Sequence, residues 1–316
     1  MQRLEFHAMG CRMLAVVDSE APEVADLLAE VPNWFATWEQ HLSRFRPDSE
    51  LMLLNSQAGK VTQVSRVMWD VLRTALWAAH WSEGLVIPTL LPELEQAGYT
   101  HSLVGEDSAQ AGEQPSLAFN LPFNQSLREG WRKITKDAKK SSICLPSGTR
   151  LDLAGVAKSW AVEQALHKLQ SYGPSLVDAG GDIALSGPRT EDAPWPIGIT
   201  NPFMPEAPIE MLLLKGGGVA TSGRDYRRWQ QGDVWQHHII DPRTGQPAQT
   251  DLVSVTVVGP STLEADVAAK AMLILGSEKG LAWLESHPSL ASFLVLDDGK
   301  VIYSHNLQPF LWQKPG

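Results

Sequence analysis

The segment between residues 141 and 187 constrains the fold of this chain more than any other. An apolar run at residues 143–145 predicts a strand, a Pro-Ser-Gly turn follows it, and residues 151–169 lead into a helix. Residues 171–187 then return to a strand that carries the pair Gly180 and Gly181. A strand, a turn, a helix and a strand in this order indicate a chain that mixes helices with sheet.

The glycine pair has two interpretations. In the first, the backbone needs positive φ at a turn or bulge, which glycine adopts at no steric cost. In the second, the backbone amides of Gly180 and Gly181 lie against a bound phosphate or ring system. The turn is the simpler explanation, because it needs no ligand.

Apolar side chains at spacings of three and four predict helices at residues 21–43 and 63–83. Between them, residues 42–55 combine charges with a Pro-Asp-Ser turn signal, which predicts a loop that reverses the chain and then re-enters ordered structure. The acidic, small-residue composition of residues 103–128 predicts a mobile polar insertion.

The C-terminal part predicts further paired elements. Residues 254–259 predict a strand, and Ser261 or Thr262 can cap the helix that follows. On that helix Asp266 and Lys270 lie one turn apart, a spacing that usually gives a solvated ion pair. Asp297-Asp298-Gly299 predicts a hairpin between the last two strands.

Residues 215–249 predict a loop-rich, polar region with a basic cluster and paired histidines. His237 and His238, as neighbours on a strand, point to opposite faces, so a metal site that uses both is disfavoured. The chain also lacks the glycine fingerprint of a Rossmann fold and a P-loop, so any nucleotide is held in another way.

Composition excludes some functions. With 316 residues, 43% of them hydrophobic, the chain can bury a large core as one unit or as two lobes. Its net charge of -10 disfavours broad attraction to nucleic acid or to an anionic membrane. Cys11 and Cys144 are too few for a disulfide framework and are predicted to be buried thiols.

The N-terminal residues predict a cytoplasmic protein. They contain no signal-peptide core, and no run of about 20 apolar residues predicts stable membrane insertion. A lipoprotein anchored at Cys11 is disfavoured, because the preceding residues are mixed polar and apolar rather than a hydrophobic leader.

Five separated segments together resemble the ApbE family of FAD:protein FMN transferases, in the family's order and over nearly the whole chain. They are MGC at residues 9–11, LSRFRPDSELMLLN at 42–55, LDLAGVAKSWAVE with VDAGGDIALSG at 151–187, VATSGRDYRRW with HHIIDPRTGQP at 219–247, and SVTVVGPSTLEADVAAKAMLILG at 254–276. The resemblance implies an α+β fold whose antiparallel sheets and covering helices surround an FAD cleft. It also implies transfer of FMN from FAD to a Thr or Ser hydroxyl of a partner protein, with release of AMP and with help from Mg²⁺.

The resemblance also assigns residues. It implies that FAD contacts residues from several segments: Met9, Leu85, Val86, Ile87, Asp152, Lys158, Thr221, Ser222, His238 and Ile240. The Gly155 carbonyl and the Asp266 carboxylate match the family's metal ligands, both hard oxygen donors that suit Mg²⁺. Asp266, together with Lys270 one turn later on the same predicted helix, is predicted to act in catalysis.

Two departures from the family pattern bear on activity. Residues 84–89 read GLVIPT where the family carries G-x-F-D-P-T, so the aromatic residue and the acid are both missing. The metal-site segment usually ends in Thr, and this chain has Lys270 there. Either the Lys270 ammonium replaces the metal partly or wholly, or Lys270 points away and leaves Asp266, the Gly155 carbonyl and waters to form a looser site.

These departures leave more than one function open. The leading hypothesis is a transferase that flavinylates an unidentified acceptor protein. The alternative is an FAD-binding flavoprotein without efficient transfer, which the residues at positions 87 and 270 favour. A third possibility is an α+β protein that binds another nucleotide.

Overall fold

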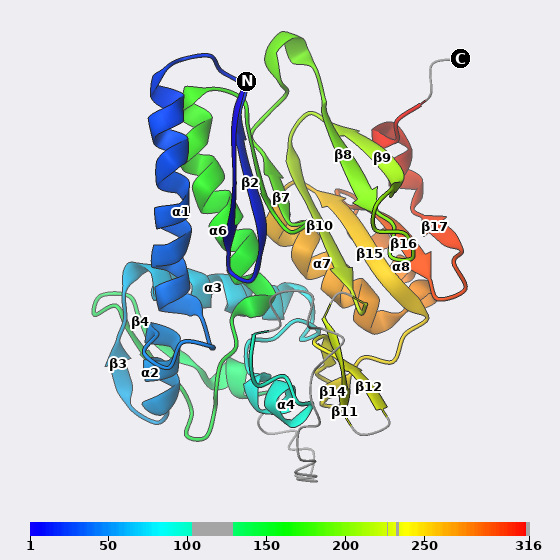
Figure 1. Cartoon of the computed structure of the whole chain (residues 1–316). Helices are drawn as coiled ribbons and strands as arrows, with labels where there is room; N and C mark the ends of the chain where they lie inside the picture. The colour runs from blue at the N-terminus through cyan, green and yellow to red at the C-terminus, as the bar shows by residue number, and fades with distance from the viewer. Residues whose placement is uncertain (103–128, 226, 232–233, 314–316) are drawn as a thin grey trace. The chain divides into compact units, whose positions relative to one another are not determined.

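The computed structural model describes residues 1–102, 129–225, 227–231 and 234–313 (Figure 1). The chain forms two compact units. Unit 1 comprises Met1–Trp34, Lys158–Asp225 and Thr250–Gly316, and unit 2 comprises Phe35–Ala157 and Tyr226–Gln249. The predicted insertion at residues 103–128 lies outside the described residues.

Unit 1 is built on an eight-stranded sheet in the order β1-β2-β6-β7-β10-β15-β16-β17, in which every pair of neighbours is antiparallel. Its strands are β1 (Gln2–Ala8), β2 (Cys11–Val17), β6 (Ser175–Ala179), β7 (Ile183–Leu185), β10 (Gly217–Gly223), β15 (Leu252–Gly259), β16 (Ala291–Leu296) and β17 (Val301–Tyr303). Consecutive pairs such as β1–β2 and β16–β17 alternate with pairs from distant parts of the sequence, such as β2–β6 and β7–β10, so the sheet joins the chain's N-terminal and C-terminal segments.

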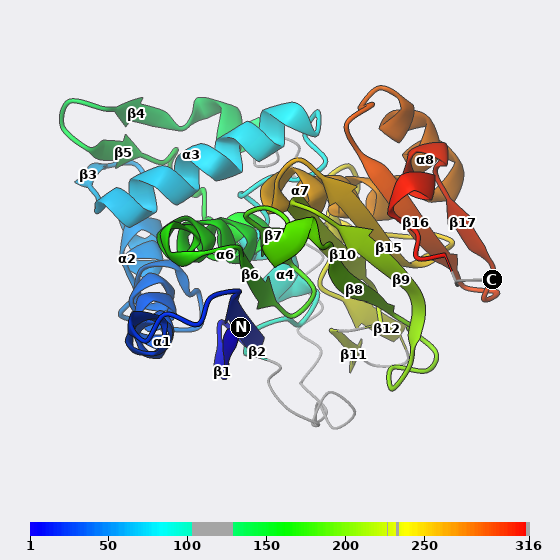
Figure 2. The same ribbon diagram turned by 90° about the horizontal axis from the view of Figure 1, so that it is seen from above.

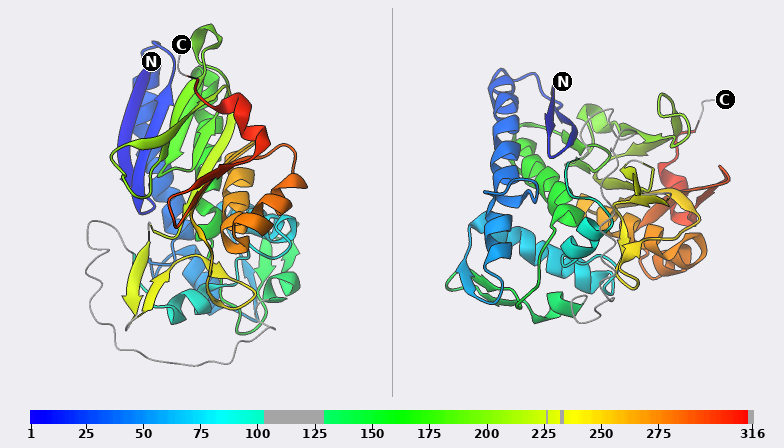
Figure 3. Two further views of the ribbon diagram at one scale, coloured as in Figure 1. Left: turned by 90° about the vertical axis from the view of Figure 1, so that its right-hand side faces the viewer. Right: turned by 60° about the horizontal axis from the view of Figure 1, so that its bottom comes forward.

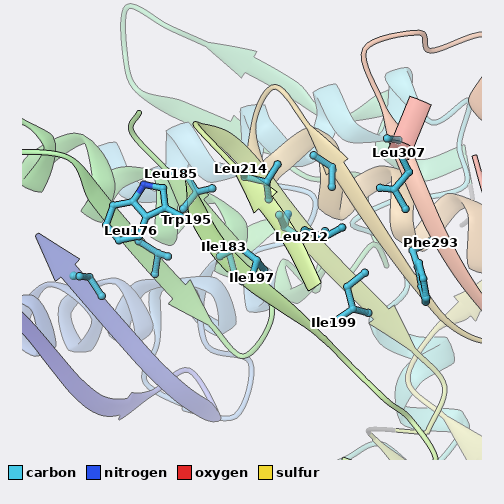
Figure 4. Packing of buried hydrophobic residues seen from close by; sticks show 14 of the residues in the cluster. Leu176, Ile183, Leu185, Trp195, Ile197, Ile199, Leu212, Leu214, Phe293 and Leu307 are labelled. Atoms are coloured by element: carbon cyan, nitrogen blue, oxygen red, sulfur yellow. The ribbon is translucent and has the colours of Figure 1, made fainter. Parts of the chain in front are cut away.

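Both faces of this sheet are covered (Figure 2). Helix α7 (Thr262–Leu275) packs on β10 and β15, and α6 (Ala154–Leu169) lies on the same face. On the other face, the hairpin of β8 (Trp195–Thr200) and β9 (Pro208–Leu214) contributes Trp195, Ile197 and Leu212 to an apolar core with the sheet (Figure 4). Because β15 is central and covered twice, all eight of its residues are buried.

Shorter elements complete unit 1. Helix α8 (Ser277–Glu285) and the 3-10 helix η5 (His305–Phe310) lie against β16 (Figure 3). Two more 3-10 helices complete the connections: η3 (Gln170–Tyr172) joins α6 to β6, and η4 (Thr190–Asp192) lies between β7 and β8. The first part of α1 (Glu23–Leu42) and most of α6 belong to this unit, and both helices continue into unit 2.

Unit 2 combines helices with short strand pairs. Besides the ends of α1 and α6, its helices are α2 (Glu50–Ser56), α3 (Arg66–Trp81), α4 (Leu91–Gln96) and the 3-10 helix η2 (Glu129–Lys133). Its strands are β3 (Val61–Gln63), β4 (Thr135–Asp137), β5 (Ser142–Cys144), β11 (Arg228–Gln231), β12 (Val234–His237), β13 (Ile240–Asp241) and β14 (Gln246–Pro247). The first three form the sheet β3-β5-β4, and the others pair as β11-β12 and β13-β14.

The α+β prediction is confirmed, and so are the helices predicted at residues 21–43 and 63–83, which are α1 and α3. Ser261 caps α7 by accepting a hydrogen bond from the Glu264 amide at 3.1 Å, as predicted. The Asp297-Asp298-Gly299 turn joins β16 to β17. Gly180 and Gly181 both have positive φ and form the turn between β6 and β7.

Two predictions were wrong in detail. Residues 217–223 form the central strand β10 rather than a polar loop, because the sheet and α7 bury small side chains that carry little hydropathy themselves. Cys11 and Cys144 are half-buried rather than buried. The loop predicted within residues 42–55 is confirmed: it ends at Ser49, which caps α2, the ordered element that follows. Within the described residues, no helix is long and apolar enough to cross a bilayer.

The close approach of β10 to the start of α7 predicts a strong effect of one methyl group. A Cβ atom on Gly218 would overlap the backbone of Ser261 and Thr262, which cannot move aside as a flexible side chain could. We expect Gly218→Ala to lower the free energy of unfolding by about 1–3 kcal/mol or more.

Gly187→Ala is the matched control, because a Cβ atom there meets nothing within 4 Å. Urea denaturation of both variants measures the difference. Equal stability of the two variants would contradict the packing described here.

Candidate functional site

Asp266 is the centre of a buried polar cluster in unit 1. Its side chain is only 2% exposed, and its Oδ1 atom contacts the Lys270 ammonium one turn later on α7. Its Oδ2 atom accepts a hydrogen bond of 2.8 Å from the Ser159 hydroxyl on α6. Burial raises the pKa of Asp266, and the charges of Lys270 and Lys158 oppose that rise. Both oxygens of this carboxylate therefore have partners.

A second ion pair belongs to the same cluster. Lys158 on α6 lies 2.5 Å from Oδ2 of Asp182, whose side chain is 2% exposed. Each of the two lysines is thus held by its own buried aspartate. Because a buried carboxylate without a partner is costly, these aspartates fix where the ammonium groups lie.

The turn between β6 and β7 brings a third carboxylate to the cluster. Asp178 is the residue before the last of β6, and its Oδ1 atom accepts a hydrogen bond of 2.8 Å from the Gly181 amide. Burial raises the pKa of Asp178 to about 6, and nearby Asp182 adds to the rise while Lys158 and Arg12 oppose it. The positive φ of Gly180 and Gly181 makes this tight turn possible.

Residues on neighbouring elements surround this turn. A Cβ atom on Gly180 would lie 3.0 Å from the Cys11 Cβ atom, and one on Gly181 would lie 3.8 Å from the Thr221 Cβ atom. Thr221 shares a 2.8 Å hydrogen bond with Thr256, and Ser222 beside it is buried. The β1–β2 turn, with Met9 at a φ of 49°, directly precedes Cys11.

A different buried ion pair lies in unit 2. Arg44 Nε is 3.0 Å from Asp152 Oδ2, and the two side chains are 4% and 8% exposed. Asp152 also caps α6, since its Oδ1 atom accepts from the Ala154 amide at 2.6 Å, while its own amide donates to the Pro88 carbonyl at 2.8 Å. Burial raises the pKa of Asp152, and Arg44 opposes the rise.

Aromatic rings bound this pair. The Arg44 guanidinium carbon lies 4.2 Å from the Phe45 ring centre and 4.4 Å from that of Tyr99. Tyr99 stacks on Trp229 with centroids 5.1 Å apart, and Trp229 donates from Nε1 to the Ala97 carbonyl at 2.7 Å. Ile240 packs in the same apolar cluster. His238 meets Tyr99 edge to face, with ring centroids 6.4 Å apart.

Comparison with known proteins identifies the family to which this chain belongs. The model of the ApbE family matches residues 9–294. The chain belongs to the ApbE family. The FAD:protein FMN transferase of Treponema pallidum (strain Nichols) is 31% identical to the chain over 306 residues, covering 92% of this chain and 83% of that protein. That of Vibrio cholerae (strain O395) is 30% identical, with 92% and 87% covered.

Solved structures agree on the fold. The ApbE protein of Thermotoga maritima superposes with a TM-score of 0.84 at 24% identity, over 99% of both chains. The flavin transferase ApbE of Vibrio cholerae gives a TM-score of 0.75 at 25% identity, over 98% of this chain and 99% of that one. The ApbE resemblance in the sequence is therefore confirmed, together with the α+β fold that it implied.

Several of the site residues implied by the resemblance lie in the two clusters. In unit 1 the structure brings together Lys158, Asp266 and Lys270, and it places Thr221 beside the glycine turn. In unit 2 it places His238 and Ile240 at the aromatic cluster with Tyr99.

The remaining implied residues of unit 2 lie around the start of α6. Leu85, Val86 and Ile87 are buried, and a Cβ atom on Gly155 would lie 3.9 Å from Val86 Cγ1. The Asp152 amide donates a hydrogen bond to the Pro88 carbonyl, and the Asp152 side chain caps α6. These unit 2 residues thus come from two segments, 85–87 and 152–155, that are far apart in the sequence.

Sequence reasoning missed several members of both clusters. Ser159, Asp178 and Asp182 lie within the family segments, but a single sequence does not show whether a polar residue is exposed or buried. Arg44 lies in the family segment at 42–55, but the sequence did not single out either Arg44 or Tyr99, because their contact depends on tertiary packing between residues far apart in the chain.

The Asp266 site does not fit a divalent metal ion. Its two oxygens are engaged by Lys270 and Ser159, and an ammonium beside the carboxylate repels a cation. In the described part of the chain, no three His, Cys, Asp or Glu side chains are grouped to hold a metal. The hypothesis that Lys270 points away from Asp266 was wrong, and so was the solvated pair expected from spacing alone.

The raised pKa of Asp178 predicts a pH-dependent effect on stability. Between its ordinary value of 3.8 and about 6, the folded protein keeps a proton that the unfolded chain releases, so stability falls as the pH rises through this window. Asp178→Asn removes that titration and keeps an oxygen for the Gly181 amide. We expect the variant to gain up to about 3 kcal/mol relative to the natural protein between pH 4 and pH 6.

Urea unfolding of both proteins at intervals from pH 4 to pH 7 measures this gain. Asp26→Asn, an exposed position on α1, is the control and should give no comparable trend. A difference between Asp178→Asn and the natural protein that stays constant with pH would show that Asp178 titrates normally.

Proposed function

We propose that this ApbE-family chain is an FAD:protein FMN transferase that moves FMN from FAD to a Thr or Ser hydroxyl of an acceptor protein. The observation that carries the proposal is the unit 1 cluster, in which Lys158 and Lys270 are each held by a buried aspartate. The names of the relatives in Treponema pallidum and Vibrio cholerae support the same reaction. The acceptor is a protein of unknown identity.

The reaction places defined demands on the protein. The acceptor oxygen attacks the phosphorus of the FMN half, a new phosphoester bond forms, and the bond from that phosphorus to the AMP oxygen breaks. The hydroxyl proton leaves to a base or to water, and AMP departs. Because negative charge is spread over the phosphate oxygens in the transition state, fixed positive charges are the main means of catalysis.

Lys158 and Lys270 suit that demand. An ammonium group acts as a point charge toward phosphate, and a partner carboxylate fixes its position before the substrate arrives. In this proposal Lys158 contacts the FAD phosphates, and Asp266 holds Lys270 in a position to do the same. Ser159 restricts Asp266 to one orientation.

We further propose that Lys270 takes the place of Mg²⁺ at this site. Most of the family is expected to bind a metal here, but Lys270 already occupies one oxygen of Asp266. Two cations cannot share one buried carboxylate without strong repulsion. The Gly155 carbonyl, which lies in unit 2, then has no metal to bind.

The other implied residues remain proposed contacts of FAD: Met9, Leu85, Val86, Ile87, Asp152, Thr221, Ser222, His238 and Ile240. The aromatic surroundings of Asp152, His238 and Ile240 support a role in holding a planar ring. A cytoplasmic location stays a prediction from the N-terminal residues.

A second candidate function is FAD binding without efficient transfer. Ile87 is only 7% exposed and stands where the family pattern has an acid, so a polar contact expected in the family is missing. A flavoprotein that holds or delivers FAD would retain the nucleotide contacts without that residue.

Incubation of the purified protein with FAD and a Thr-bearing acceptor protein separates the two functions. A transferase produces AMP and covalent flavin on the acceptor in equal amounts, which chromatography and mass spectrometry measure. An FAD-binding protein without transfer binds FAD tightly and leaves it intact. Absence of FAD binding would contradict both.

The proposed role of Lys270 predicts a gain of metal binding. In Lys270→Thr a hydroxyl oxygen replaces the ammonium, so the repulsion disappears and an oxygen ligand is added. We expect Mg²⁺ affinity to rise by about tenfold or more, because unit charges about 4 Å apart near a protein surface interact with about 4 kcal/mol. Isothermal titration with Mg²⁺ in the presence of FAD measures this change.

Lys279→Thr provides the matched control, since Lys279 is an exposed lysine on α8. It should leave Mg²⁺ affinity unchanged. If the natural protein binds Mg²⁺ as tightly as Lys270→Thr does, Lys270 does not replace the metal.

A further inference from the structure

The Arg44 side chain in unit 2 is buried and has N–H groups that lack a hydrogen-bond acceptor among the described residues. The side chain is 4% exposed, and neither Nε nor Nη2 has a hydrogen-bond acceptor in the described structure. Nε lies 3.0 Å from Asp152 Oδ2, so the charges are paired, but the angles do not make a hydrogen bond. Nη2 has no hydrogen-bond partner among the described residues.

Such an arrangement is costly. A buried donor without an acceptor costs about 1–3 kcal/mol, and more when the group is charged. Arginine cannot avoid the cost by losing its proton. An acceptor supplied from outside the chain would remove this penalty, which is the physical reason to look for a ligand here.

The rings around Arg44 restrict where that acceptor can lie. Phe45 and Tyr99 contact the guanidinium at 4.2 and 4.4 Å from their ring centres, and Tyr99 is itself fixed by its stack on Trp229. Since the N–H groups of a guanidinium lie in its plane, they point along its edges. The guanidinium is therefore held rigid by aromatic contacts before any ligand binds.

The charge balance selects the kind of acceptor. Asp152 already pairs with Arg44, so a phosphate would place further negative charge beside this buried carboxylate. Burial raises the pKa of Asp152 in spite of Arg44, which means that these surroundings disfavour even one negative charge. A neutral acceptor fits, such as a ring carbonyl oxygen or a ring nitrogen.

We propose that Arg44 is a specificity residue that donates a hydrogen bond from Nη2 to a neutral acceptor on a planar ring of FAD. The acceptor is either a carbonyl of the isoalloxazine or a nitrogen of the adenine. The inference rests on the proposed function, because it takes FAD as the nucleotide. It adds a residue that recognises a ring of FAD rather than its phosphates.

Titration of Arg44→Lys with three ligands tests the proposal. Lysine keeps the positive charge beside Asp152 but lacks the second planar donor. Calorimetry with FAD, FMN and AMP should show a loss of FAD affinity of about tenfold or more, since hydrogen bonds to charged groups contribute about 1.5–3 kcal/mol. A matching loss for FMN assigns the isoalloxazine, and a matching loss for AMP assigns the adenine.

Arg46→Lys is the control variant, because Arg46 lies in the same loop but has an exposed side chain that donates a hydrogen bond to Gln40. It should bind every ligand as the natural protein does. The proposal is overturned if Arg44→Lys keeps full affinity for all three ligands. It is also overturned if the variant lowers the melting temperature of the ligand-free protein while the affinities stay unchanged, which would mark a purely structural ion pair.

A measurement on the natural protein needs no variant. With ¹⁵N-labelled arginine, the Arg44 side-chain signals should shift when FMN or AMP saturates the protein, and an unchanged spectrum would contradict the contact. Release of AMP plays no part in these tests. If FAD binds through Arg44 but no AMP forms, the transferase proposal fails and the assignment of Arg44 stands.

Discussion

The burial of one carboxylate, that of Asp266, sets the chemistry of unit 1. A buried aspartate must be neutralised, and here an ammonium and a hydroxyl engage its two oxygens. Lys270 can serve because it lies one helical turn from Asp266 and therefore on the same face of α7. The pairing of Asp266 with Lys270, where the family pattern has Thr, is the basis of the proposal that Lys270 takes the place of the metal.

The fold holds this pair in place through backbone contacts. Helix α7 begins at a fixed point, since Ser261 caps it and Thr262 donates a hydrogen bond of 2.8 Å to the Ile183 carbonyl. Gly218 on β10 leaves just enough room for that start. Helix α6 supplies Lys158 and Ser159 from the same face of the sheet, so the two ion pairs depend on how two helices cover one sheet.

Much of this could be predicted from the sequence, and the failures have physical causes. Helix periodicity predicted α1 and α3, capping residues predicted α7, and the family segments pointed to Lys158, Asp266 and Lys270. Strand β10 was missed because its glycines and hydroxyl residues carry no apolar alternation, although tertiary packing buries four of the strand's seven residues. Arg44 was missed because its burial depends on Tyr99 and Asp152, which are distant in the chain. Sequence spacing could place Lys270 near Asp266, but only the surrounding packing decides that their pair is buried.

The most direct test of this account is a crystal structure of the protein grown with FAD and a high concentration of Mn²⁺, which can stand in for Mg²⁺ and gives an anomalous signal. The account predicts that Lys270 stays on the Asp266 carboxylate and that no anomalous peak lies within coordination distance of it, about 2.0–2.2 Å for a small divalent cation. A Mn²⁺ ion bound to Asp266, with Lys270 displaced into solvent, would contradict the account and restore the metal to the site.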